Sequence, residues 1–70
     1  MTPKQIKSAR LRAGLSQGAL AQILGTHAMT ISKWERGERQ PDSSAVAALR
    51  MLVWAKDNGV IDQLTDYLRT

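Results

Sequence analysis

The amino-acid sequence predicts an all-α fold of five short helices. Helix start signals stand at Thr2, Ser16 and Asp42-Ser43, and glycines that commonly follow a helix end stand at positions 14, 25, 37 and 59. Between these signals apolar residues recur with helical spacing, and no stretch alternates like a strand. We expect helices over about residues 3–13, 17–24, 28–36, 43–57 and 60–69.

Length and residue types narrow the possible functions. A chain of 70 residues is expected to form one domain of marginal stability, for which pairing with a second copy is favourable. With no cysteine and one histidine, we expect no disulfide, metal site, cofactor or catalytic group. The chain has neither the roughly 20 apolar residues of a membrane span nor a secretory signal, so we expect a soluble cytoplasmic protein.

Charge is unevenly distributed along the chain. The net charge is +4; residues 1–40 carry seven basic and two acidic side chains, and residues 41–70 carry three basic and four acidic ones. The basic part suits a polyanion such as a nucleic acid, although a solvated lysine-rich helix face gives the same composition.

The first two helices have recognisable beginnings. Thr2 and Gln5 have the spacing of a capping box before the helix over 3–13. Ser16 is a suitable N-cap for the helix over 17–24. Gly18 weakens that helix by up to about 1 kcal/mol relative to alanine, so we expect tertiary packing or a close backbone approach at this position.

The third helix, beginning near His27 or Ala28, predicts a buried ion pair. If Ile31 faces inward, Glu35 lies within about 40° of it on the helical wheel, and Lys33 points away. Arg10 lies on the apolar side of the helix over 3–13. Because a buried charge needs a partner, we expect Arg10 to pair with Glu35; the alternative is that both extend to solvent.

The last two helices carry more apolar surface than one small core requires. The stretch 45–55 is apolar nearly all round, which indicates burial on more than one side. Residues 60–68 show the i, i+4, i+7, i+8 pattern of an amphipathic helix. Either Trp54 belongs to the core or it contributes to a surface for another chain.

The second and third helices together form a helix-turn-helix pattern. Leu20, Leu24, Ile31 and Trp34 supply the shared core, and Gly25 permits the tight turn. The wider set of matching residues is Arg10, Ala13-Gly14-Leu15-Ser16-Gln17, Leu20-Ala21, Gly25, Ile31-Ser32-Lys33-Trp34-Glu35-Arg36-Gly37 and Pro41. In these residues the chain resembles the λ-repressor/Cro-type (XRE-type) family of helix-turn-helix regulators over about residues 5–55.

This resemblance implies a five-helix fold, a dimer on a palindromic operator in double-stranded DNA, and the third helix in the major groove. It also implies an ion pair at Arg10 and Glu35. The chain departs from the family at Thr26, usually apolar, and at His27, usually serine or threonine. Either His27 or Thr26 therefore caps the third helix.

Expected DNA contacts fall into two groups. Base contacts are expected where the third helix begins and one turn later. A histidine or serine would form a hydrogen bond with a base, apolar side chains would contact thymine methyl groups, and a lysine would bind guanine. Phosphate contacts are expected from the start of the second helix, from a threonine and from polar residues just beyond the third helix. The base-contacting candidates are His27, Ala28, Met29, Ser32 and Lys33, and the phosphate-contacting candidates are Gln17, Thr30, Arg36, Arg39 and Gln40.

The function expected is a sequence-specific transcriptional regulator, most simply a repressor of its own promoter, like phage or mobile-element members of the family. The expected dimer surface comprises Val53, Trp54, Leu64, Tyr67 and Leu68. The alternative is an interaction module such as an antitoxin, which binds a partner protein as well as, or instead of, DNA.

Overall fold

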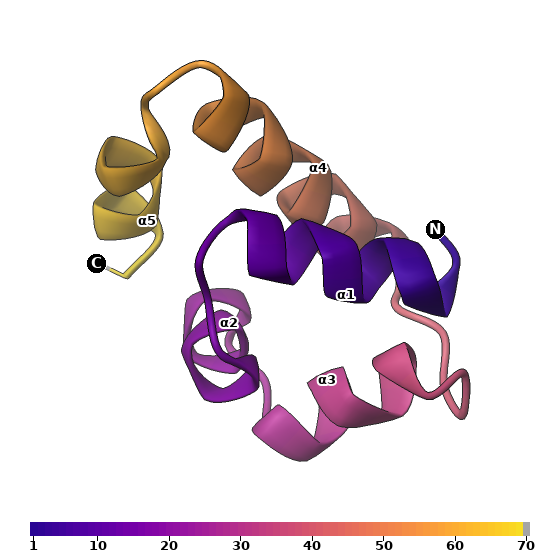
Figure 1. The fold of residues 1–70 in the computed structure, drawn as a ribbon. Coiled ribbons are helices and arrows are strands. Elements are labelled where there is room, and N and C mark those ends of the chain that lie inside the picture. The colour runs from indigo at the N-terminus through magenta and orange to yellow at the C-terminus, as the bar shows by residue number, and fades with distance from the viewer. Residues whose placement is uncertain (70) are drawn as a thin grey trace.

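Five α-helices account for the architecture of the computed structural model, which describes residues 1–69. They are α1 (Pro3–Arg12), α2 (Gln17–Leu24), α3 (Ala28–Glu35), α4 (Ser43–Asp57) and α5 (Ile61–Arg69), and the described residues contain no strand (Figure 1). The all-α prediction is therefore confirmed. The observed bounds of α2 and α4 agree with those expected, whereas α1 and α3 end one residue earlier and α5 begins one residue later.

Local side-chain caps determine where three helices begin. Thr2 Oγ1 accepts from the backbone N–H of Gln5 at 3.1 Å, and Gln5 Oε1 accepts from that of Thr2 at 2.9 Å, which completes the expected capping box. Ser16 Oγ accepts from Ala19 N at 3.0 Å. At α4 the cap is Asp42, whose carboxylate accepts from Ala45 N at 2.8 Å.

A Schellman motif ends α3. Gly37 has a φ of 76°, a left-handed conformation that favours glycine. Its N–H donates to Trp34 O at 3.2 Å, and Glu38 N–H donates to Lys33 O at 2.9 Å. Those two bonds are the pair that defines the motif. The chain thus reverses sharply after α3 and carries residue 38 back beside the last turn.

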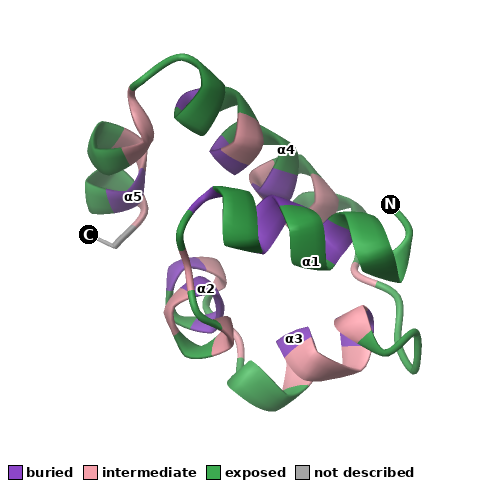
Figure 2. Cartoon of the chain, in the orientation of Figure 1, coloured by how far each residue is buried: buried purple, intermediate pink, exposed green. Residues whose placement is uncertain are grey.

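The core lies where the inner faces of the helices meet. Ile6, Leu20, Ile31, Leu49 and Leu52 are fully buried, at about 1.5–3 kcal/mol of hydrophobic stabilisation each. The main packing pairs are α2 with α3, α1 with α3 and with α4, and α5 with α2 and with α4. Figure 1 shows α1 crossing the middle of the molecule between α4 and α3, and Figure 2 shows the buried residues on the facing sides.

Only one side of α4 enters the core, so burial on more than one side is not observed within this chain. Leu49, Leu52 and Ala55 are buried, whereas Met51 and Trp54 are exposed, Trp54 by 61%. Trp54 is therefore not a core residue. None of the described helices combines the length and the apolarity that crossing a membrane requires.

Candidate nucleic-acid interface

The angle between α2 and α3 is set by a short turn and a shared core. Gly25 adopts φ 70° and ψ 33° at the end of α2, and Thr26 N–H donates to Ala21 O at 2.9 Å. Leu20, Ala21, Ile31 and Trp34 are all buried between the helices. A left-handed residue at this point turns the chain within three residues, which is the helix-turn-helix geometry expected from the sequence.

A hydrogen-bonded ion pair fastens α3 to α1. Arg10 Nε donates to Glu35 Oε2 at 2.7 Å and Arg10 Nη2 donates to Glu35 Oε1 at 3.0 Å, with only 9% and 5% of the two side chains exposed. Arg10 Nη1 also donates to the carbonyl oxygen of Leu15 at 2.9 Å. The pair expected from the helical wheel thus forms, and the alternative in which both groups extend to solvent is wrong.

The charges of this pair are mutually stabilised. Burial by itself would raise the pKa of Glu35, but hydrogen bonds from Arg10 and Gln17 and the charges of Arg10 and Lys7 outweigh it, so this pKa lies below its ordinary value. For Arg10, the hydrogen bond to Glu35 raises the pKa, against the opposing effect of burial. Both groups therefore remain charged at neutral pH, and α3 keeps a fixed position relative to α1.

Gln17 is drawn into the same network. Its Nε2 donates to Glu35 Oε1 at 3.3 Å, and the residue is half-buried at the start of α2. Gln17 was expected to contact a phosphate. In the structure its amide links the beginning of α2 to the ion pair, a bond that the sequence does not indicate because it depends on how α2 crosses α3.

The opposite side of α3 is open to solvent. His27, Ala28 and Met29 are exposed, Met29 by 61%, and Figure 2 shows the start of α3 as exposed. Ser32 and Lys33, one turn on, are half-buried. These are the five residues expected to reach base edges: Ala28, Met29, Ser32 and Lys33 belong to α3, and His27 immediately precedes it.

The N-cap of α3 is His27, in extended conformation and with no side-chain cap hydrogen bond. The alternative in which Thr26 caps the helix is therefore wrong: α3 begins at Ala28, and Thr26 instead donates its N–H within the turn. The imidazole of His27 is thus not used as a cap and lies at the exposed end of the helix.

Three of the residues expected to contact phosphate lie at or just beyond the end of α3. Arg36, Arg39 and Gln40 are exposed. Half-buried Thr30 lines a hollow shared with Arg39, Gln40 and residues of α4. Glu38 was not among the expected residues, yet it forms an ion pair with Arg36 beside this surface. Its proximity to Arg36 in sequence was a signal, but the direction of the carboxylate depended on the turn at Gly37.

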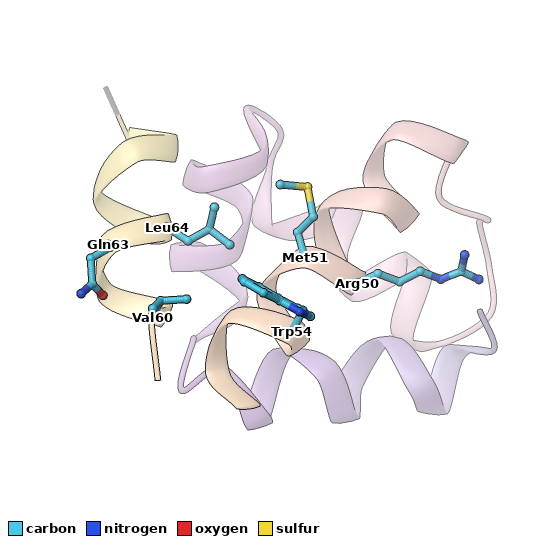
Figure 3. A pocket seen from close by; sticks show the side chains of 6 residues that line it. All are labelled: Arg50, Met51, Trp54, Val60, Gln63 and Leu64. Atoms are coloured by element: carbon cyan, nitrogen blue, oxygen red, sulfur yellow. The ribbon is translucent and has the colours of Figure 1, made fainter. Parts of the chain in front are cut away.

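The residues expected at a dimer surface do not lie together. Trp54 and Leu64 line a groove between α4 and α5, in which Figure 3 shows them with Met51 and Val60. Val53 instead lines a hollow beside α1, and Leu68 packs against the core. Tyr67 is 76% exposed on α5. The α4–α5 groove is mainly apolar and is lined by Arg50, Met51, Trp54, Val60, Gln63 and Leu64.

Comparison with known proteins agrees with this geometry. A family model described as helix-turn-helix matches residues 6–50. The chain is also 33% identical over 52 residues to antitoxin HigA-2 of Vibrio cholerae serotype O1 (strain ATCC 39315 / El Tor Inaba N16961), an alignment that covers 74% of this chain and 50% of the relative. The chain therefore spans about half the length of this curated relative. No solved structure gives a significant match.

Fold, turn geometry, ion pair and family match all lead to one assignment. Residues 6–50 contain α2, α3 and the turn between them, together with Arg10 and Glu35. The match covers well over half of the 70 residues. The chain belongs to the λ-repressor/Cro-type (XRE-type) helix-turn-helix family of DNA-binding regulators.

Proposed function

We propose that this protein is a sequence-specific transcriptional repressor that binds a palindromic operator as a homodimer, with α3 in the major groove. The observation that carries the proposal is the asymmetry of α3. Its inner face is buried and fastened to α1 through Arg10 and Glu35, while His27, Ala28 and Met29 remain exposed at its start. A rigid helix with an open N-terminal end is suited to reading base edges.

Each residue expected to read a base has a matching base chemistry. Lys33 reaches O6 or N7 of guanine, and Ala28 and Met29 contact thymine methyl groups. His27 and Ser32 donate to a base edge or to the adjacent backbone. This arrangement gives α3 both a polar and an apolar means of telling base pairs apart.

Phosphate contacts hold the helix in register. Arg39 and Gln40 follow α3 on the exposed loop, and Arg36 lies at its last turn. Thr30, which lines a hollow with Arg39 and Gln40, and Gln17, at the start of α2, add polar groups. Contacts of this kind provide affinity and orientation but carry no sequence information.

A homodimer presents two copies of α3 to the DNA, one for each half of the operator. The exposed apolar groove between α4 and α5, which includes Trp54 and Leu64, supports self-association. A two-fold axis through such an interface places two copies of α3 about one helical turn of DNA, roughly 34 Å, apart. A protein of this kind acts on the nucleoid, in the cytoplasm of a bacterium or phage-infected cell, and its own promoter is the first site to examine.

The proposal is tested by selecting duplexes from a random-sequence library with the full chain. The expected result is an enriched inverted repeat whose half-sites are centred about 10 base pairs apart. Footprinting upstream of the protein's own gene then locates the natural site. Failure to enrich any sequence, together with equal binding of all duplexes, would contradict a sequence-specific regulator.

A second candidate function is that of an antitoxin that also binds a protein. The relative from Vibrio cholerae is named an antitoxin, and the groove at Met51, Trp54 and Leu64 offers an apolar surface away from α3. Co-purification from the native host tests it, with Trp54→Asp as the control that should lose the partner. Recovery of the homodimer alone, with DNA binding intact, would favour the first function.

A further inference from the structure

The turn after α3 places an acidic side chain beside the expected DNA surface. The Schellman motif at Gly37 returns the chain so that Glu38 N–H bonds to Lys33 O at 2.9 Å. Glu38 therefore lies next to the last turn of α3 rather than continuing away from it. Its position is fixed by the backbone and does not depend on its own side chain.

The Glu38 carboxylate holds Arg36. Arg36 Nε donates to Glu38 Oε2, and Arg36 Nη1 donates to Ser32 Oγ at 2.6 Å. Two of the three guanidinium nitrogens are thus engaged within the protein. About half of each side chain in the ion pair is exposed, so the contact lies at the surface where DNA is expected.

The Glu38 carboxylate lies in a basic part of the chain. Glu35 and Glu38 are the two acidic residues among the first 40, and Glu35 is directed inward to Arg10. Glu38 is therefore the acidic group among the exposed cations around α3. The hydrogen bond from Arg36, with the charges of Arg36 and Lys33, lowers the pKa of Glu38, so it is ionised at neutral pH.

We infer that Glu38 limits the affinity of this protein for duplex DNA by holding Arg36 against α3 in competition with the backbone phosphates. This inference rests on the proposed function. A phosphate that binds Arg36 through Nε must displace the carboxylate, and one that binds at Nη2 meets its negative charge. Glu38 thus acts through Arg36 as a positioning residue, and does not itself contact a base.

The competition has a distinct signature in salt dependence. The logarithm of the binding constant falls linearly with the logarithm of the salt concentration, and each phosphate contact made by a cation makes this slope steeper by about 0.9. Without the carboxylate, Arg36 is available for one more such contact at any DNA sequence. Removing the charge of Glu38 should therefore tighten binding and steepen the salt dependence together.

The experiment compares Glu38→Gln with a matched control, Asp57→Asn. Asp57 forms an exposed ion pair with Arg12 at 2.7 Å, so both changes remove one negative charge from one exposed arginine pair. Asp57 is the last residue of α4, and Figure 1 shows this end of α4 on the opposite side of the molecule from α3. Affinity for a random-sequence duplex is measured by fluorescence anisotropy across a salt series.

The expected result is that E38Q binds the random duplex about three- to tenfold more tightly, with a slope steeper by about 0.9, while D57N changes affinity less than about twofold. When Arg36 is already replaced by alanine, the change in the logarithm of DNA affinity caused by E38Q should be less than about half of the change in the wild-type background. Equal gains for E38Q and D57N, or no gain for E38Q, would overturn the inference. A wild-type chain that binds no duplex overturns the proposed function, and the inference with it.

Discussion

Arg10 and Glu35 are 25 positions apart in the sequence, yet their side chains form a two-point hydrogen bond inside the molecule. The guanidinium also bonds to the backbone of Leu15, and the carboxylate also accepts from Gln17. One buried pair thereby joins α1, the connection to α2, the start of α2 and the end of α3. The orientation of the expected recognition helix depends on this contact.

Breaking the pair from one side should destabilise the fold. Glu35→Ala leaves the buried charge of Arg10 without its partner, and the expected loss is about 3–5 kcal/mol of unfolding free energy. Urea denaturation followed by circular dichroism measures it. The control is Asp57→Asn, which breaks the exposed pair with Arg12 and should cost less than about 1 kcal/mol. Equal losses in both variants would contradict the structural role of Glu35.

Acid should weaken the fold through the same carboxylate. The pKa of Glu35 is lower in the folded chain than the unfolded value of about 4.3, so the unfolded state binds more protons as pH falls through this range. The stability due to the pair is therefore present above about pH 4.3 and is lost as pH falls toward the folded pKa. Urea midpoints between pH 7 and pH 3 measure this, and Glu35→Gln should flatten the dependence. An equally steep dependence in that variant would assign the effect to other carboxylates.

Lys33 should determine sequence preference and Arg39 should not. Lys33→Ala is expected to cost about 1–3 kcal/mol on the selected operator and to relax preference at one base pair per half-site. Arg39→Ala should weaken binding to operator and random duplex equally, because a phosphate contact is independent of sequence. Affinities for the operator and its single-base variants measure both effects. If Lys33→Ala lowered both affinities equally, its role in base reading would be wrong.

Gly18 offers a test of why the first turn of α2 contains a glycine. A Cβ built there meets only Ser16 Oγ at 4.0 Å, so tertiary packing of the chain does not exclude a side chain. Gly18→Ala should stabilise the fold by up to about 1 kcal/mol. Gly25→Ala, at φ 70°, should instead destabilise it by about 1–2 kcal/mol. Thermal unfolding measures the stability of the two variants. If Gly18→Ala folds stably but loses affinity for DNA, the DNA backbone approaches closely at this position.

Trp54 should be required for self-association but not for folding. Because its side chain is 61% exposed on α4, Trp54→Asp should change the unfolding free energy by less than about 1 kcal/mol. Sedimentation at micromolar concentration should show wild-type dimers and mutant monomers. Leu11→Asp, at another exposed apolar position, on α1, is the control and should remain dimeric. A wild-type chain that is monomeric both free and on DNA would contradict the homodimer.

Features determined by local sequence were predictable. The capping box at Thr2 and Gln5 and the serine cap at Ser16 depend on residues three positions apart, and both form as expected. The Arg10–Glu35 pair could also be inferred, because a helical wheel places each charge on an inward face and a buried charge requires a partner.

Features that depend on how helices meet were not predictable. The apolar sequence of α4 could not reveal which of its sides α5 leaves uncovered, so the position of Trp54 remained open. Similarly, Val53 and Leu68 were expected beside Trp54, but the rotation of α4 and α5 directs them to other hollows. The bond between Gln17 and Glu35 required the crossing of α2 and α3.

The main packing pairs of the helices also have a consequence for communication within the molecule. Taken in the order α1, α3, α2, α5, α4 and back to α1, they close into a ring. The groove between α4 and α5 is therefore linked to α3 by two routes, one through α1 and one through α2. On either route a single helix stands between the groove and α3, so that loss of the contacts on one route leaves the other continuous.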